Sequence, residues 1–170
     1  MHLQFRKART ADQNKIWKVL QDGIAQRKKE GSTQWQNGYP NLEIIKKDIL
    51  QGHGFVLTKK EQVIGYCAIL INDEPDYKHI NGAWLSNKDY VVFHRMAISQ
   101  NEIGNGYATL LFKEIEAYAR KLRIESIKAD TNFDNYAMLY LFKKMGYQLC
   151  GEVMLKGSPR KAFEKVIHLY

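Results

Sequence analysis

The stretch from Val91 to Ala108 constrains the fold of this chain more than any other. It reads VVFHRMAISQNEIGNGYA, an apolar strand-like run followed by a short polar loop that carries Gly104 and Gly106. The loop opens into an amphipathic segment, Thr109 to Leu122, with apolar residues at helical spacing. Glycines let backbone N–H groups approach an anion, and a helix start adds positive potential. The pattern predicts a phosphate-binding strand–loop–helix unit, with an ordinary strand-to-helix turn as the alternative.

Composition limits the class of protein. The 170 residues, 45% of them hydrophobic, suit one domain with a sizeable core, and we expect a single domain over residues 1–170. No apolar run approaches the ~20 residues that a membrane span needs, and the N-terminal MHLQFRKART lacks an apolar signal region. Cys67 and Cys150 match no metal or redox spacing, and the five histidines form no ligand motif. We therefore expect a cytoplasmic protein without a metal ion.

The formal net charge of +8 raises the question of a nucleic-acid partner. However, lysines and arginines are spread over the whole chain in short pairs such as Lys28–Lys29 and Lys143–Lys144, without a dense basic stripe. A small polyphosphate ligand or a plain solvated surface accounts equally well for this balance. The charge pattern therefore does not favour nucleic acid.

Strand-like and helical patterns follow one another along the chain and predict an α/β domain. The segment Thr10-Ala11-Asp12-Gln13 has the form of a capping box with Thr10 as the N-cap, and Asn41 is expected to cap a second, shorter helix. The polar turn 59–62 predicts a hairpin. The expected strands are 3–8, 55–58, 63–71, 91–98, 125–129, 148–154 and 161–169, and the later helices are 109–122 and 135–145.

Two irregular segments carry aromatic residues that are candidates for acceptor binding. Segment 28–40 contains Trp35 and Tyr39, and segment 72–88 contains Trp84. Aromatic side chains in a loop either pin the loop to the core or line a pocket, where they can hold an amine by cation–π contact. We name these three as candidate substrate-binding residues, with core packing as the alternative.

Two pieces of the chain together resemble the GNAT acyltransferase superfamily, whose members take an acetyl group from acetyl-CoA. The loop Ile103–Ala108 resembles the family signature Arg/Gln-x-x-Gly-x-Gly/Ala, with Ile103 where the family usually has Arg or Gln. The signature has two positions for small residues. Counting from the end of the preceding strand places Gly106 and Ala108 at these two positions; the alternative alignment places Gly104 and Gly106 there. The segment 135–147 resembles the family helix Asn-x-x-Ala-x-x-Leu-Tyr-x-x-x-Gly-Phe, read loosely.

The resemblance implies a fold and a cofactor. The fold is a GNAT-like mixed, largely antiparallel sheet of six to seven strands, with helices on both faces and a splay between the two central parallel strands. Acetyl-CoA is the implied co-substrate: loop N–H groups would bind its pyrophosphate, and the strand edge would pair with its pantetheine arm. The implied cofactor-binding residues are Met96, Ala97, Ile98, Ile103, Gly104, Asn105, Gly106, Tyr107, Ala108, Thr109, Asn135 and Phe142.

The resemblance also implies direct attack by a primary amine of a small molecule on acetyl-CoA in a ternary complex. His94 is the candidate base, with a structural histidine as the alternative, and Asp130 is a second candidate for binding or orienting the amine. Phe142 stands where the family commonly has a tyrosine acid, so we expect solvent to protonate the thiolate. Alternatives are a protein or peptide N-acetyltransferase and a non-catalytic module that binds CoA or nucleic acid; a homodimer is left open.

Overall fold

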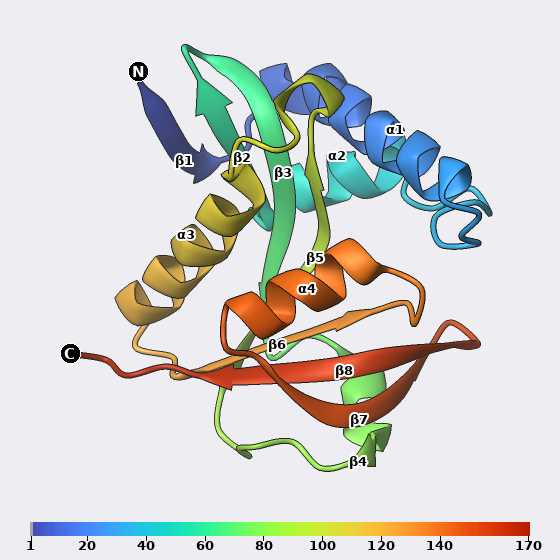
Figure 1. Ribbon diagram of the computed structural model, residues 1–170. Helices are drawn as coiled ribbons and strands as arrows, with labels where there is room; N and C mark the ends of the chain where they lie inside the picture. Colours follow the sequence, from blue (N-terminus) through green and yellow to red (C-terminus); the bar gives the residue numbers. More distant parts are fainter. Residues whose placement is uncertain (1) are drawn as a thin grey trace. The chain divides into compact units, whose positions relative to one another are not determined.

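The computed structural model describes residues 2–170 as a mixed α/β fold (Figure 1). Over these residues, eight strands form one sheet, and no helix is both long and apolar enough to cross a membrane. The strands are β1 (Leu3–Lys7), β2 (Gly54–Lys59), β3 (Gln62–Ile71), β4 (Asn81–Gly82), β5 (Tyr90–Ile98), β6 (Ser126–Thr131), β7 (Gln148–Leu155) and β8 (Ser158–Val166). The helices are α1 (Gln13–Lys29), α2 (Leu42–Leu50), α3 (Tyr107–Lys121) and α4 (Tyr136–Lys144), with 3₁₀ segments η1 (Thr10–Asp12), η2 (Pro75–His79) and η3 (Gln100–Glu102).

The sheet is mixed and largely antiparallel, as the sequence predicts. Its strand order is β1-β2-β3-β5-β6-β8-β7-β4. The pairs β1–β2, β2–β3, β6–β8, β7–β8 and β4–β7 are antiparallel, whereas β5 and β6 run parallel. The sheet exceeds the expected six or seven strands because Asn81 and Gly82 pair with β7 as a two-residue strand. A segment this short has no periodicity that a sequence pattern can reveal.

The chain forms two compact units. The first contains the residues up to Ile69 together with Arg95–Leu111, and the second contains Leu70–His94 together with Phe112–Tyr170. The chain therefore passes from one unit to the other within β3, β5 and α3. A single domain over residues 1–170 stays a prediction.

In the first unit, helices cover both faces of β2 and β3. Neighbouring strand residues such as Val56 and Leu57 point to opposite faces because side chains alternate along a strand. One face carries the cluster of Ile16, Val19, Leu20, Ile45, Val56, Val63, Tyr66 and Ala97, which we call the α1–α2 cluster. The other face carries the cluster of Leu57, Ile64, Tyr107 and Leu111, which we call the α3 cluster.

In the second unit, aromatic rings of α4 contact aromatic rings of β5 and β8. Phe142 of α4 stacks on Phe163 of β8 with 4.4 Å between ring centroids and an interplanar angle of 20°. The cluster comprises Phe93, Phe112, Phe142, Tyr147 and Phe163. On β5, Val92 belongs instead to a separate cluster with Tyr77, Val153 and Ala162.

Several local predictions are confirmed. Asn41 caps α2, since its Oδ1 accepts a hydrogen bond from Ile44 N at 3.0 Å. β2 and β3 form the expected antiparallel hairpin. Gly146, with a φ of +79°, follows the end of α4 as a left-handed helix stop.

The capping box expected at Thr10 is wrong. Thr10 begins the 3₁₀ segment η1, and the long helix starts only at Gln13. Asp12 Oδ2 accepts the hydrogen bond from Arg9 N at 2.8 Å and also receives one from Arg6 Nη1 at 2.7 Å. The carboxylate of Asp12 therefore caps the backbone of Arg9, one position before the expected N-cap, and is also held by an ion pair with Arg6 of β1.

Candidate active site

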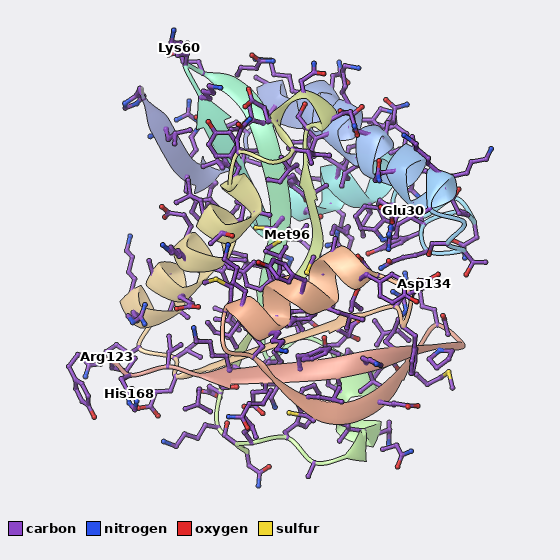
Figure 2. The ribbon with its side chains drawn as sticks, viewed as in Figure 1. Glu30, Lys60, Met96, Arg123, Asp134 and His168 are labelled. Carbon is purple, nitrogen blue, oxygen red and sulfur yellow. The ribbon has the colours of Figure 1, made fainter. Side chains whose placement is uncertain are left out.

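Strand β5, which includes the labelled Met96 in Figure 2, departs from regular β geometry at Arg95. The φ angle of Arg95 is +54°. This left-handed conformation costs a non-glycine residue about 1–3 kcal/mol and is concentrated at functional sites. After Arg95, Ala97 packs into the α1–α2 cluster, whereas Met96 and Ile98 pack against the α3 cluster. A left-handed residue inside a strand locally interrupts its ladder and redirects backbone groups.

The pairing between β5 and β6 covers the beginning of β5. The parallel register runs from Tyr90 to Val92, whereas β6 keeps its antiparallel pairing with β8 as far as Thr131. Within the second unit, His94 therefore does not continue the ladder with β6. An early end of this pairing is what the expected splay between the two parallel strands requires.

The glycine loop joins η3 to α3. Gly104 and Gly106 have φ angles of +86° and +80°, and a Cβ on either would meet none of the surrounding described residues within 4 Å. The helix begins at Tyr107, two residues before the expected start, and Leu110 N–H donates to Gly106 O at 3.0 Å. The loop thus combines an open, glycine-bearing backbone with the first turn of a helix. That arrangement suits an anion such as a pyrophosphate.

One acidic side chain of this loop is neutralised by a neighbouring strand. Lys59 Nζ of β2 lies 3.0 and 3.1 Å from the two carboxylate oxygens of Glu102, and Asn105 Nδ2 donates to Glu102 Oε2 at 3.3 Å. Ile103, which replaces the usual Arg or Gln, is 55% exposed and contributes no charge. Anion binding here would therefore depend mainly on the main chain.

In the second unit, His94 lies between two carboxylates. Its Nε2 is 3.0 Å from Glu74 Oε2, and its Nδ1 is 3.9 Å from Asp130 Oδ2. Nε2 is buried, and although Glu74 is close, the angles of this contact do not fit a hydrogen bond. Tyr77 of η2 donates its hydroxyl hydrogen to Asp130 Oδ2 at 2.7 Å. The structure therefore brings the two candidate catalytic residues together and adds Glu74 and Tyr77.

The surroundings set the protonation of two of these groups. Burial acts to raise the pKa of Glu74, but the contacts with His94, the backbone of Asp76 and the charge of Lys156 together hold that pKa below its usual value. Burial, followed by the charge of Asp130, raises the pKa of Tyr77 well above its usual value, so the phenol stays a donor. An imidazole beside carboxylates can bind a cationic amine and accept its proton. Over residues 2–170, no group of three or more His, Cys, Asp or Glu side chains is arranged to hold a metal ion.

The two candidate residues from α4 have structural roles. Asn135 caps the helix, since its Oδ1 accepts a hydrogen bond from Met138 N at 3.2 Å. Phe142 is fully buried within the aromatic cluster. Direct contact of either side chain with a cofactor stays a prediction.

Trp35 and Tyr39 tie the segment 28–40 to the first unit. Trp35 has a φ of +63°, and its ring packs against the α1–α2 cluster. The ring lies so close to α1 that a Cβ on Gly23 would stand 2.9 Å from it. Tyr39 Oη accepts a hydrogen bond from Arg95 Nη1 at 2.7 Å. These contacts support the pinning role for both residues, and substrate binding stays a prediction.

Trp84 forms half of an aromatic pair that surrounds an ammonium group of the chain itself. Lys128 Nζ lies 4.5 Å from the ring centroid of Trp84 and 4.3 Å from that of Tyr90. Trp84 Nε1 donates to Tyr77 O at 2.9 Å, which fixes the ring. Lys128 is 4% exposed, and burial lowers its pKa. The pair therefore suits a cation, but Lys128 already fills the space between the rings.

Sequence reasoning missed Glu74, Asp48 and Arg95 as parts of the candidate site. Glu74 lies in the long irregular segment 72–88, whose length was the one available signal. A strand-like sequence pattern gives no sign of the left-handed backbone at Arg95. No sequence pattern connects Asp48, on a helix, with the Arg95 side chain that it binds.

Comparisons with known proteins identify the family of the chain. Residues 24–147 match the family model described as Acetyltransferase (GNAT) family. A GNAT-family acetyltransferase from Streptococcus agalactiae is 33% identical, with a TM-score of 0.88 over 98% of this chain and 96% of that one. A GNAT-family acetyltransferase from Listeria monocytogenes is 19% identical, with a TM-score of 0.78 over 97% of this chain and 95% of that one.

A third solved structure, NAA60 from Arabidopsis thaliana in complex with a bisubstrate analogue, is 13% identical, with a TM-score of 0.68 over 99% of this chain and 100% of that one. Likeness at this level of identity concerns the fold alone. No curated protein matches the chain.

Proposed function

The chain belongs to the GNAT family of acetyltransferases, and from this premise we propose that it is an acetyl-CoA-dependent N-acetyltransferase for primary amines of small molecules. One observation carries the proposal. In the first unit, a strained strand residue, an open glycine loop and the first turn of α3 follow one another within Arg95–Leu110. This is a backbone arrangement that suits an amide-bearing arm followed by a pyrophosphate.

The residues of the first unit fit acetyl-CoA. The positive φ angles and empty surroundings of Gly104 and Gly106 leave room for close approach of an anion to the main chain. The edge of Met96–Ile98 would pair with the pantetheine amides, and the N–H of Met96 or Ala97 would polarise the thioester carbonyl. When bound, acetyl-CoA supplies the activated acetyl group.

The residues of the second unit supply the proton acceptor. The amine must lose a proton before its nitrogen can attack, and in this proposal His94 accepts that proton. Glu74 and Asp130 would hold the ammonium form of the substrate and stabilise the imidazolium that results, because both carboxylates face the ring. The new C–N bond forms as the C–S bond breaks, and the second proton that the nitrogen loses on becoming an amide passes to solvent. A thiol has a pKa of about 8.5, so solvent can protonate the departing thiolate, a step that Phe142 cannot perform.

The acceptor is proposed as a small molecule because loop 28–40 is pinned to the core by Trp35 and Tyr39. A loop that is held against the core limits the size of the acceptor more than an open surface does. We also propose a cytoplasmic location, which the two free cysteines support.

The proposal is tested by measuring thiol release from acetyl-CoA with a panel of small amines and short peptides. We expect His94→Ala to lower kcat about 100-fold and Glu74→Gln about 10-fold, since general-base catalysis typically contributes 10²–10⁴-fold. The affinity for CoA should remain unchanged in both. His79→Ala, which removes an exposed histidine of η2, is the matched control and should keep full activity.

Three outcomes would contradict the proposal. Unchanged kcat in His94→Ala would remove His94 as the base. Faster turnover of peptides than of any small amine would move the activity to the protein-modifying class. Thermal stabilisation by a short DNA duplex but not by acetyl-CoA would refute the enzyme altogether.

A further inference from the structure

The guanidinium of Arg95 is held from several sides within the first unit. Its Nε and Nη2 donate to Asp48 Oδ2 and Oδ1 of α2 at 3.0 and 2.7 Å, and its Nη1 donates to Tyr39 Oη at 2.7 Å. Tyr66 of β3 donates its hydroxyl hydrogen to Asp48 Oδ2 at 2.5 Å. The side chains of Arg95 and Asp48 are only 7% and 3% exposed. Three segments distant in sequence thus fix one side chain of β5.

The charges of this network are stable. Burial acts to lower the pKa of Arg95, but Tyr39 and Asp48 outweigh burial and raise it. Burial, followed by Asp48, raises the pKa of Tyr66 as well. The guanidinium therefore stays charged and the Tyr66 hydroxyl stays protonated. A buried, forked pair of this kind holds its geometry firmly because losing one partner leaves an uncompensated charge.

The same residue carries the strained backbone. A φ of +54° persists at a non-glycine residue only when the surroundings fix it. The planar fork fixes both the position and the orientation of the Arg95 side chain, and the side chain in turn constrains its own backbone. Lysine at this place would keep the charge but could not reproduce the fork.

We propose that Arg95 is a positioning residue that, through Asp48, Tyr39 and Tyr66, holds the β5 backbone so that the Met96 N–H meets the thioester carbonyl. This inference rests on the proposed function. Met96 follows the left-handed residue directly, so the direction of its N–H depends on the backbone angles of Arg95. A displacement of about 1 Å at a reacting centre can cost about 100-fold in rate. Tyr39 also links this backbone to the loop 28–40.

The competing explanation is an ion pair that contributes to stability only. The chain contains a matched control for it. Arg6 of β1 also forms a two-point ion pair within the same unit: its Nη1 and Nη2 donate to Asp12 Oδ2 and Oδ1 at 2.7 and 3.0 Å. Arg6 is not among the residues with a positive φ and belongs to a strand with regular pairing. A role in stability alone predicts similar effects of Arg95→Lys and Arg6→Lys.

The experiment compares the full-length wild type with Arg95→Lys, Arg6→Lys and Tyr39→Phe. The infrared carbonyl band of bound acetyl-CoA reports the hydrogen bond to the thioester without turnover, and kcat and the Kd for CoA are measured alongside. We expect a shift of the band to lower frequency in the wild type and in Arg6→Lys. Arg95→Lys should lose that shift and at least about 10-fold in kcat, with the Kd for CoA within about threefold.

Each remaining result has a defined meaning. Tyr39→Phe leaves the Arg95–Asp48 pair intact and tests the network even if Arg95→Lys does not fold; we expect a partial loss of the band shift and about threefold lower kcat. Two results would overturn the positioning role while leaving the activity in place. One is a wild-type carbonyl band and wild-type kcat in both Arg95→Lys and Tyr39→Phe. The other is an equal loss of band shift and kcat in Arg95→Lys and Arg6→Lys. A wild type that does not bind acetyl-CoA would refute the proposed function and this role with it.

Discussion

The two glycines of the loop allow a prediction in which one substitution controls for the other. Gly104 and Gly106 share nearly the same φ, +86° and +80°, and both are open where a Cβ would stand. Alanine at either position therefore meets no clash in the free protein and suffers only the left-handed backbone, about 1–2 kcal/mol. For a chain of this length, that corresponds to a fall in Tm of about 2–8 °C, equal for both variants.

Their effects on ligand binding should differ. In the preferred register of the loop motif, Gly106 and Ala108 are the two small residues, and Gly106 would lie close to the pyrophosphate of CoA. Gly104 is not one of these two residues. A methyl group at Gly106 would push the anion away from the main chain and remove a charge-assisted hydrogen bond of about 1.5–3 kcal/mol. Gly106→Ala should weaken CoA binding about 10- to 150-fold, and Gly104→Ala less than about threefold.

The assay is calorimetric titration of both variants with CoA, together with their thermal unfolding in the absence of ligand. Equal loss of stability with unequal loss of affinity is the expected result. An equal loss of affinity in the two variants, or a larger one in Gly104→Ala, would refute the chosen register. Clearly unequal Tm values would refute the argument from matched strain.

Two further predictions concern the core and the N-terminal ion pair. Phe142→Tyr should change kcat less than about threefold and should lower the free energy of unfolding by about 1–3 kcal/mol, because its hydroxyl would enter a fully buried site; a tenfold gain in thiol release would contradict this. The hydrogen bond from Arg6 lowers the pKa of Asp12 despite burial, so the pair should stabilise the fold above the unfolded pKa of about 4 and lose this contribution as pH falls through the folded value. Urea unfolding between pH 3 and pH 6 should therefore show a flatter pH dependence for Asp12→Asn, and an unchanged slope would contradict it.

Local patterns along the chain were sufficient for most of the fold. The hairpin of β2 and β3, the Asn41 cap and the strand–glycine loop–helix unit each depend on residues within a few positions of one another. Interactions of that range leave a periodicity or a motif in the sequence. The same holds for the family, whose two motifs lie in contiguous segments and whose model matches residues 24–147.

Local sequence patterns did not predict which residues contact the candidate catalytic side chains. The contact of Glu74 with His94 joins residues that lie in an irregular segment and in a strand. Trp84, a candidate for holding an amine, has one ring face against Lys128 of the same chain. Such contacts arise when separate elements pack together, and the identity of either residue alone does not specify the other.

The sequence by itself determined the succession of strands and helices of an α/β domain, with a glycine loop between β5 and α3, because helical and strand periodicities and glycine conformations are local properties. The tertiary structure alone decided which side chains hold Arg95 of β5. Arg95 has a left-handed backbone conformation, and its side chain is held by Asp48 and Tyr39, while Tyr66 in turn holds Asp48. Strain of this kind persists only where packing and buried charge outweigh its cost, and that balance exists only in the folded chain.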